Sequence, residues 1–165
     1  MNIKTLLSLV LFPLNFFISC TGGGEQGGQA VLNESTTGII AQDIIYDVEI
    51  KNPDKDDPWM DNALKGLDRE TLISYIFQGV YDDHLQAYDI FEGNKISSRK
   101  ILQMEEDGEF SRDEIGKIQF TEQWTYDSLN HVMSKRVTAV SLGIQNFDPE
   151  GYLRGYKPLF KVILP

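Results

Sequence analysis

The residue in this chain best suited to chemistry is Glu122, which stands in the stretch FTEQWTYD between Phe120 and Trp124. An acid among aromatic rings can have a raised pKa and act as a general acid. A hydrolase of the glycosidase type would need a second carboxylate across a cleft, yet the neighbours two residues away are both aromatic. The competing interpretation is a charge that pairs across strands with Lys135 or Arg136. The sequence leaves both open.

The other residues able to do chemistry are sparse. The two histidines, His84 and His131, have no His or Cys at metal-ligand spacing. The acidic stretch DKDDPWMD lacks the Gly at the sixth position and the Glu at the twelfth that a calcium loop requires. Neither a phosphate-binding glycine loop nor a nucleophile elbow is present. The sequence therefore predicts no enzyme, no cofactor and no metal site.

Composition limits the classes of partner. The chain has 165 residues, which predicts one domain, and its hydrophobic content of 41% suffices for a core. Its net charge of −10 argues against nucleic acid as a partner. The charge is uneven: residues 43–114 hold 19 acidic and 8 basic side chains, whereas residues 115–165 hold 4 and 6. This distribution suggests two differently charged surfaces, or ordinary solvated faces.

The N-terminus is typical of a targeting segment. A positive start is followed by an apolar run up to residue 19 that is short for a membrane span. Cys20, the only cysteine, comes directly after this run, as in a bacterial lipoprotein signal. We therefore predict a lipoprotein signal peptide over residues 1–19 and lipidation of Cys20, the alternative being an ordinary signal with an incidental cysteine. Residues 20–42 are rich in Gly and predict a flexible, lipid-anchored tether.

The remaining residues, 43–165, predict a single domain that begins with a short apolar run at Ile44, Ile45 and Tyr46, followed by an acidic, proline-containing loop over 51–61. Asp68 is a good N-cap for a helix over 69–80 whose apolar residues form one stripe. Ser97 or Ser98 can cap a second, short helix. LQAYDIF is typical of a short strand.

The C-terminal third predicts an antiparallel meander. Apolar and polar residues alternate from 117 to 127, which is typical of a half-buried strand. Turn sequences at 127–130 and 148–151 separate it from strands over 132–144 and 152–164. The expected fold class is α+β, with one or two helices packed on this meander behind a flexible tether.

Two stretches of the chain resemble the GldN/PorN family. FTEQWTYDSLNHVMSKRVTAVSLGI followed by GYLRGYKPLFKVIL is similar to the C-terminal part of that family, and LISYIFQGV with LQAYDIF resembles its helix-then-AYD segment. The similarity covers residues 72–164. Lys161 stands where the family usually has Trp, and the family's upstream Trp- and Arg-rich segment has no clear counterpart.

The family consists of periplasmic components of gliding motility and the type IX secretion system of Bacteroidetes. The resemblance implies a non-enzymatic scaffold below the outer membrane. Together with the predicted lipidation of Cys20, it leads us to expect a periplasm-facing chain anchored at the outer membrane, although in the family's secretion ring a different partner carries the lipid. The resemblance also implies an envelope protein partner such as a ring lipoprotein, and assembly into homo-oligomers or rings. Aromatic and Arg side chains are common interface anchors, so we expect interface residues among Trp124, Tyr126, Arg154 and Tyr156. The alternatives are an envelope lipoprotein that binds a small ligand or glycan, and a carboxylate-based hydrolase that uses Glu122.

Overall fold

The structure is a computed structural model that describes residues 37–54 and 56–165. These residues belong to one compact unit. Its elements are, in chain order, β1 (Thr37–Glu49), α1 (Pro58–Leu64), α2 (Arg69–Tyr81), β2 (Ala87–Tyr88), β3 (Lys95–Ile96), α3 (Ser98–Glu106), the 3-10 helix η1 (Arg112–Glu114), β4 (Ile115–Asp127), β5 (Val132–Phe147) and β6 (Leu153–Ile163). The predicted signal peptide, Cys20 and most of the predicted tether lie outside the described residues.

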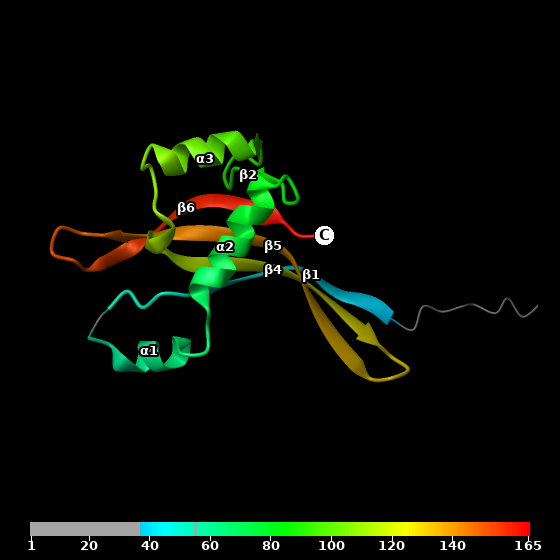
Figure 1. The fold of residues 1–165 in the computed structure, drawn as a ribbon. Coiled ribbons are helices and arrows are strands. Elements are labelled where there is room, and N and C mark those ends of the chain that lie inside the picture. Colours follow the sequence, from blue (N-terminus) through cyan, green and yellow to red (C-terminus); the bar gives the residue numbers. More distant parts are fainter. Residues whose placement is uncertain (1–36, 55) are drawn as a thin grey trace, which may run out of the picture. The chain divides into compact units, whose positions relative to one another are not determined.

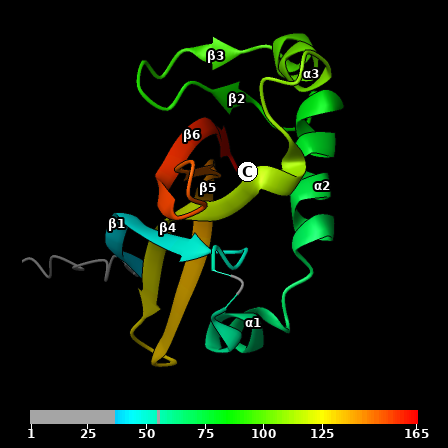
Figure 2. The same cartoon turned by 90° about the vertical axis from the view of Figure 1, so that its left-hand side faces the viewer.

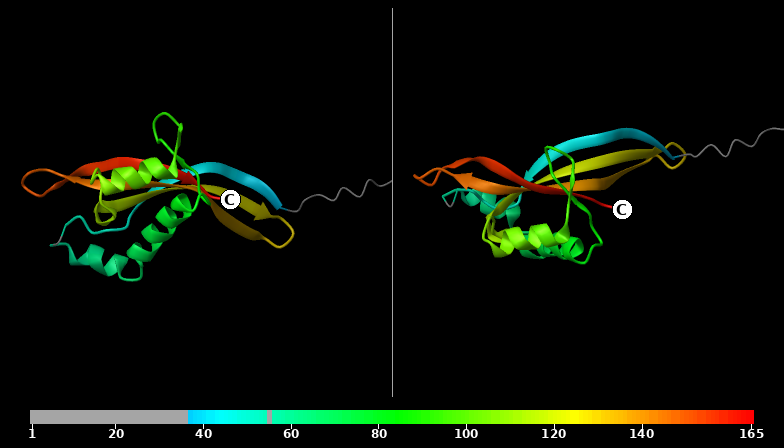
Figure 3. Two further views of the ribbon diagram at one scale, coloured as in Figure 1. Left: turned by 45° about the horizontal axis from the view of Figure 1, so that its top comes forward. Right: turned by 90° about the horizontal axis from the view of Figure 1, so that it is seen from above.

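The strands form one antiparallel sheet in the order β1-β4-β5-β6-β2-β3 (Figure 1). The predicted meander is confirmed, since β4, β5 and β6 are consecutive neighbours joined by the two expected turns. Three α-helices accompany the sheet in the described part of the chain, which confirms the α+β class. Seen from above, the helices all lie on one side of the sheet (Figure 3).

Strand β1 corrects the predicted boundary of the tether. The sequence analysis assigned residues up to 42 to a flexible segment, but the strand begins at Thr37. Gly38 pairs with Tyr126 and Ile39 with Thr125 of β4, so long-range backbone pairing overrides a local composition that suits a linker. The pairing is irregular between Ile39 and Ile44, where β1 carries extra residues.

The helix caps read from the sequence are confirmed. The Asp68 carboxylate accepts a hydrogen bond from the Thr71 amide at 3.0 Å, and the Ser97 side chain caps α3. The expectation of a loop over 51–61 is wrong at its end, because α1 begins at Pro58. There the Asp57 carboxylate accepts from the backbone amide of Trp59 at 2.9 Å, and a proline is favourable at the first helical position.

The core lies between the helices and the middle of the sheet. Phe77 of α2 is fully buried, with ring centroids 5.3 Å from Phe160 of β6 and 5.6 Å from Phe110. Ile118 and Leu142 pair directly across β4 and β5 and are also buried. Each such side chain contributes about 1.5–3 kcal/mol of hydrophobic stabilisation.

A polar cluster covers one edge of this core. The Arg112 guanidinium lies 4.4 Å above the Phe77 ring and donates to Glu105 through Nε at 2.5 Å and a second nitrogen at 2.8 Å. The Tyr81 hydroxyl also donates to Glu105. Burial, followed by this carboxylate, raises the pKa of Tyr81 to about 12. The cluster fixes α2, α3 and η1 relative to one another.

The sheet has two ends, which we name by their turns. The distal end carries the turn between β4 and β5, and the proximal end carries the turn between β5 and β6. The helices cover the middle of the sheet, while the distal β4–β5 hairpin extends past them, as Figure 2 and Figure 3 show. The distal end is therefore not covered by the helices.

Candidate functional site

Glu122 lies in the middle of β4 and is only 5% exposed. Its Oε1 accepts a hydrogen bond of 2.6 Å from the hydroxyl of Tyr46 on β1. Its Oε2 accepts one of 2.9 Å from the indole nitrogen of Trp124, and the Lys135 ammonium is 3.9 Å away. The cross-strand partner expected from the sequence is thus found, and Tyr46 is a partner that the sequence analysis missed.

These donors set the protonation of Glu122. The hydrogen bond from Tyr46 lowers the pKa of the carboxyl, Trp124 and Lys135 act in the same direction, and burial opposes them. The raised pKa that aromatic neighbours can cause is therefore not found for Glu122, because the rings of Tyr46 and Trp124 present hydrogen-bond donors to the carboxylate. A general acid needs the opposite shift. In its described contacts Glu122 is an ionised acceptor that joins β1, β4 and β5.

The four predicted interface residues lie at opposite ends of the sheet. Trp124 and Tyr126 belong to the distal end, whereas Arg154 and Tyr156 belong to the proximal end. On β5 their pairing partners are separated by the ten residues from Lys135 to Gln145. At ~3.3 Å per residue this is about 33 Å, so the four side chains do not share one contact surface.

At the distal end, both predicted residues are at least partly accessible. Trp124 is half-buried, with the Lys135 ammonium 4.4 Å from its ring centroid. Tyr126 is 36% exposed, and its hydroxyl is 2.9 Å from Nδ1 of His131 in the turn.

At the proximal end, Arg154 is exposed and Tyr156 is half-buried. The Tyr156 ring lies 4.3 Å below the Lys117 ammonium. Burial, followed by the nearby Glu49, raises the pKa of the Tyr156 hydroxyl, which makes no hydrogen bond to the described residues. Its ring therefore packs mainly within its own sheet.

Exposed apolar side chains gather at the distal end on both faces of the sheet. We call them the distal patch, which consists of Ile39, Ile40, Tyr126, Val132 and Met133. Tyr126 and Met133 pair directly and share one face, whereas Ile39 and Val132 pair with Thr125 and Asp127 and lie on the other face. The members come from three adjacent strands, β1, β4 and β5. Ile39 and Ile40 were missed because their segment was assigned to the tether, although two adjacent isoleucines in a Gly- and Thr-rich stretch are a usable signal.

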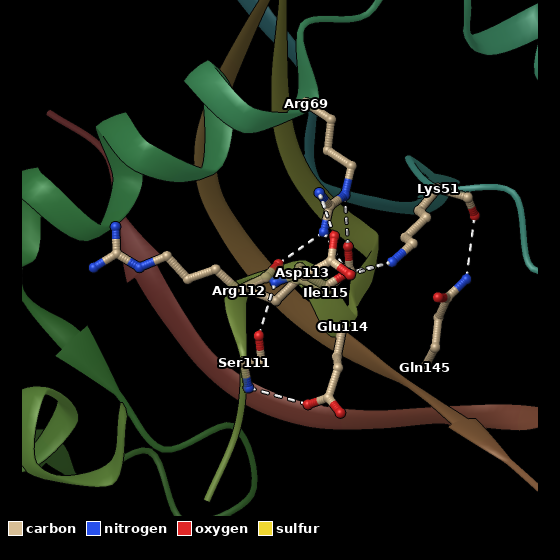
Figure 4. A network of polar contacts seen from close by, with 8 residues as sticks. All are labelled: Lys51, Arg69, Ser111, Arg112, Asp113, Glu114, Ile115 and Gln145. Carbon is tan, nitrogen blue, oxygen red and sulfur yellow. Dashed lines mark hydrogen bonds and ion pairs between the residues drawn. The ribbon is translucent and has the colours of Figure 1, made fainter. Parts of the chain in front are cut away.

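A network of polar contacts holds the proximal end together (Figure 4). The Arg69 guanidinium of α2 donates to the carbonyl oxygens of Arg112, Asp113 and Ile115 at 2.7–3.0 Å. The Lys51 ammonium donates to the Asp113 carboxylate at 2.9 Å. The network thereby joins the segment after β1 to α2 and to the start of β4.

The segment after β1 and the turn between β5 and β6 enclose a cleft of about 810 Å³ at this end. Three other clefts in the described residues are smaller, at about 150–250 Å³. Within residues 37–54 and 56–165, no three His, Cys, Asp or Glu side chains are arranged to hold a metal ion. Among the helices of the same residues, none has the length and apolar character to cross a membrane.

Comparison with known proteins adds no assignment: no family model and no curated protein matches this chain. The resemblance to the gliding-motility family therefore rests on the motifs quoted from the sequence. The predicted lipidation residue, Cys20, lies outside the described residues.

Proposed function

We propose that this chain is a non-enzymatic scaffold lipoprotein of the bacterial envelope that binds a protein partner through the distal patch. It resembles periplasmic components of gliding motility and type IX secretion, and Cys20 anchors it to the outer membrane facing the periplasm. The observation that carries the proposal is the group of exposed apolar side chains on three adjacent strands.

The chemistry of the patch supports binding rather than catalysis. Its five side chains are 36–56% exposed, so their burial by a partner would release apolar surface from water. The neighbouring Trp124 and the aromatic ring of Tyr126 are of the types that dominate interface hot spots. Strand β1 adds an edge of the sheet at which another chain can pair.

The proposal is tested by photocrosslinking in the native cell. A photoreactive residue replaces Ile40 or Met133 in the full chain, and controls carry it at Tyr75 or Trp59, which are 72% and 73% exposed on the helices. We expect one discrete crosslinked species from the two patch positions and none from the controls. The Trp124→Ala substitution should weaken that crosslink. Equal crosslinking from all four positions, or none from the patch, would contradict the proposal.

A further inference from the structure

The cleft at the proximal end is far from the distal patch and has a different character. One wall is the segment after β1, with Asn52, Asp54 and Asp56, and the other is the turn between β5 and β6, with Glu150 and Tyr152. Its volume of about 810 Å³ falls in the range of sites that bind small molecules or a few residues of a peptide.

Two aromatic rings at the cleft are accessible. Tyr152, which directly precedes β6, is 73% exposed, and Phe147, the last residue of β5, is 42% exposed. The backbone at Tyr152 is fixed, since its amide donates to the Asp148 carboxylate at 2.8 Å and its carbonyl accepts from the Asp148 amide at 2.9 Å. The cleft therefore presents ring faces on a held backbone.

A mostly buried amide also lines the cleft. Gln145 is only 8% exposed, and its nitrogen donates to the Lys51 carbonyl at 3.3 Å (Figure 4). Its side-chain oxygen is a hydrogen-bond acceptor in the lining, which suits a ligand that brings an N–H or O–H group.

The charges of the lining decide which kind of donor fits. Asp54, Asp56 and Glu150 form no ion pair with the described residues. Among the described residues of the lining, Lys51 is the one basic side chain, and it is bound to Asp113. The cleft thus combines three carboxylates, an amide oxygen and two accessible rings. An ammonium or guanidinium group can interact with each of these three kinds of group. It attracts the carboxylates by its charge, donates hydrogen bonds to the amide oxygen and makes cation–π contacts with the rings.

We propose that this cleft binds a lysine or arginine side chain presented by an extended segment of a partner protein. The proposal goes beyond the function assigned to the distal patch and does not depend on it, because the two surfaces lie at opposite ends of the sheet. Phe147 and Tyr152 take the flat or apolar part of the side chain, and Glu150 and Gln145 accept its N–H groups.

The test uses the full chain in non-ionic detergent and a fluorescein-labelled peptide of alternating Gly and Arg, with fluorescence anisotropy as the readout. We expect saturable binding that weakens with salt. Tyr152→Ala should weaken it about two- to fivefold, the loss expected for an exposed cation–π contact. Glu150→Gln, which keeps the shape of the turn, should weaken it as well.

Matched controls come from the same chain. Tyr75→Ala removes an equally exposed ring from α2, and Glu106→Gln removes one exposed negative charge from the end of α3. Neither should change the affinity by more than the error of measurement. Equal weakening by Glu106→Gln would show that net charge alone attracts the peptide, and would overturn the proposal.

Three competitors separate the remaining ligand classes. A peptide with citrulline in place of Arg should bind at least several times more weakly. Equal affinity for that peptide would exclude recognition of a cationic group. Displacement of the Arg peptide by calcium at constant ionic strength would instead identify a metal site, and displacement by a neutral disaccharide would identify a glycan site. Either result would overturn the proposal.

Discussion

At the scale of single residues, the main finding is that the environment of Glu122 reverses its expected chemistry. Sequence reasoning placed the carboxylate among rings, and rings alone would have raised its pKa. The hydroxyl of Tyr46 comes from a strand 76 residues away in the sequence and supplies the strongest opposing contact. Spacing within β4 contains no information about that donor, so this part of the site could not be predicted locally.

The Tyr46→Phe substitution tests this contact through its pH dependence. The pKa of Glu122 is lowered in the folded state, so its ionised form stabilises the fold above the ordinary pKa, and this contribution is lost as the pH falls through the lowered value. We expect the variant to be less stable than the wild type at pH 7, with a difference that shrinks below about pH 4. Urea unfolding of both proteins from pH 7 to pH 3 measures this difference in the free energy of unfolding. Tyr75→Phe, at an exposed hydroxyl, should show no such difference at any pH.

A second residue-scale prediction concerns Gly116 at the start of β4. A Cβ placed there would lie 2.4 Å from Cγ of Gln145 and 2.6 Å from its Cδ. Gln145 is buried and hydrogen-bonded, so it has little room to move. Gly116→Ala should lower the free energy of unfolding by about 1–3 kcal/mol, as overpacking does.

Chemical denaturation measures the effect of Gly116→Ala, and Gly38→Ala is its control because no atom lies within 4 Å of a Cβ at that position. Equal midpoints for the two variants would contradict the prediction.

At the scale of elements, prediction worked where the signal is local. The alternation along β4, the turns on either side of β5 and the caps Asp68 and Ser97 all depend on residues close together in the sequence, and all are confirmed. The start of helix α1 could also have been predicted from the sequence, since Asp57 followed by Pro58 is a typical helix start. The full length of β1 was not, because only its pairing with β4 makes residues 37–42 a strand.

Because β1 is an edge strand, we expect hydrogen exchange of its backbone amides to alternate between slow and fast along the strand. The Ile50 amide donates to the carbonyl of Gly116 in β4, and alternate residues of an antiparallel strand face the same neighbour. The amides of Ile44, Tyr46 and Val48 therefore face β4 and should exchange slowly.

The amides of Ile45, Asp47 and Glu49 face the outer edge and should exchange fast. Hydrogen exchange followed by NMR checks this. Slow exchange at all six positions in the isolated chain would show that the outer edge is covered.

At the scale of the whole molecule, the structure separates two surfaces of different chemistry at the two ends of one sheet. The distal patch is apolar and the proximal cleft is acidic. The sequence suggested differently charged surfaces, but it grouped Trp124 and Tyr126 with Arg154 and Tyr156 because it gave no distances. Their separation follows from the direction in which β5 runs between the two turns.

The lipid anchor is also a prediction about the whole molecule. Cys20→Ser should release the chain from the membrane fraction, because each buried methylene of an acyl chain contributes ~0.8 kcal/mol to membrane binding. Fractionation of cells in high salt measures this, and Ser19→Ala serves as a control substitution beside the modified position. Membrane association of Cys20→Ser that persists in high salt would contradict the lipoprotein assignment.

The place of β1 in the sheet also has a kinetic consequence. The strands β4 and β5 are joined by the short turn at residues 128–131, so they can pair early, whereas β1 must close a loop that includes all the helices before it reaches β4. We infer that β1 docks after the β4–β5 hairpin has formed. Substitutions on β1 such as Ile45→Ala should therefore speed unfolding and leave the folding rate nearly unchanged. Until β1 docks, the outer edge of β4 is open to other chains, and folding of this protein is most vulnerable to aggregation at that step.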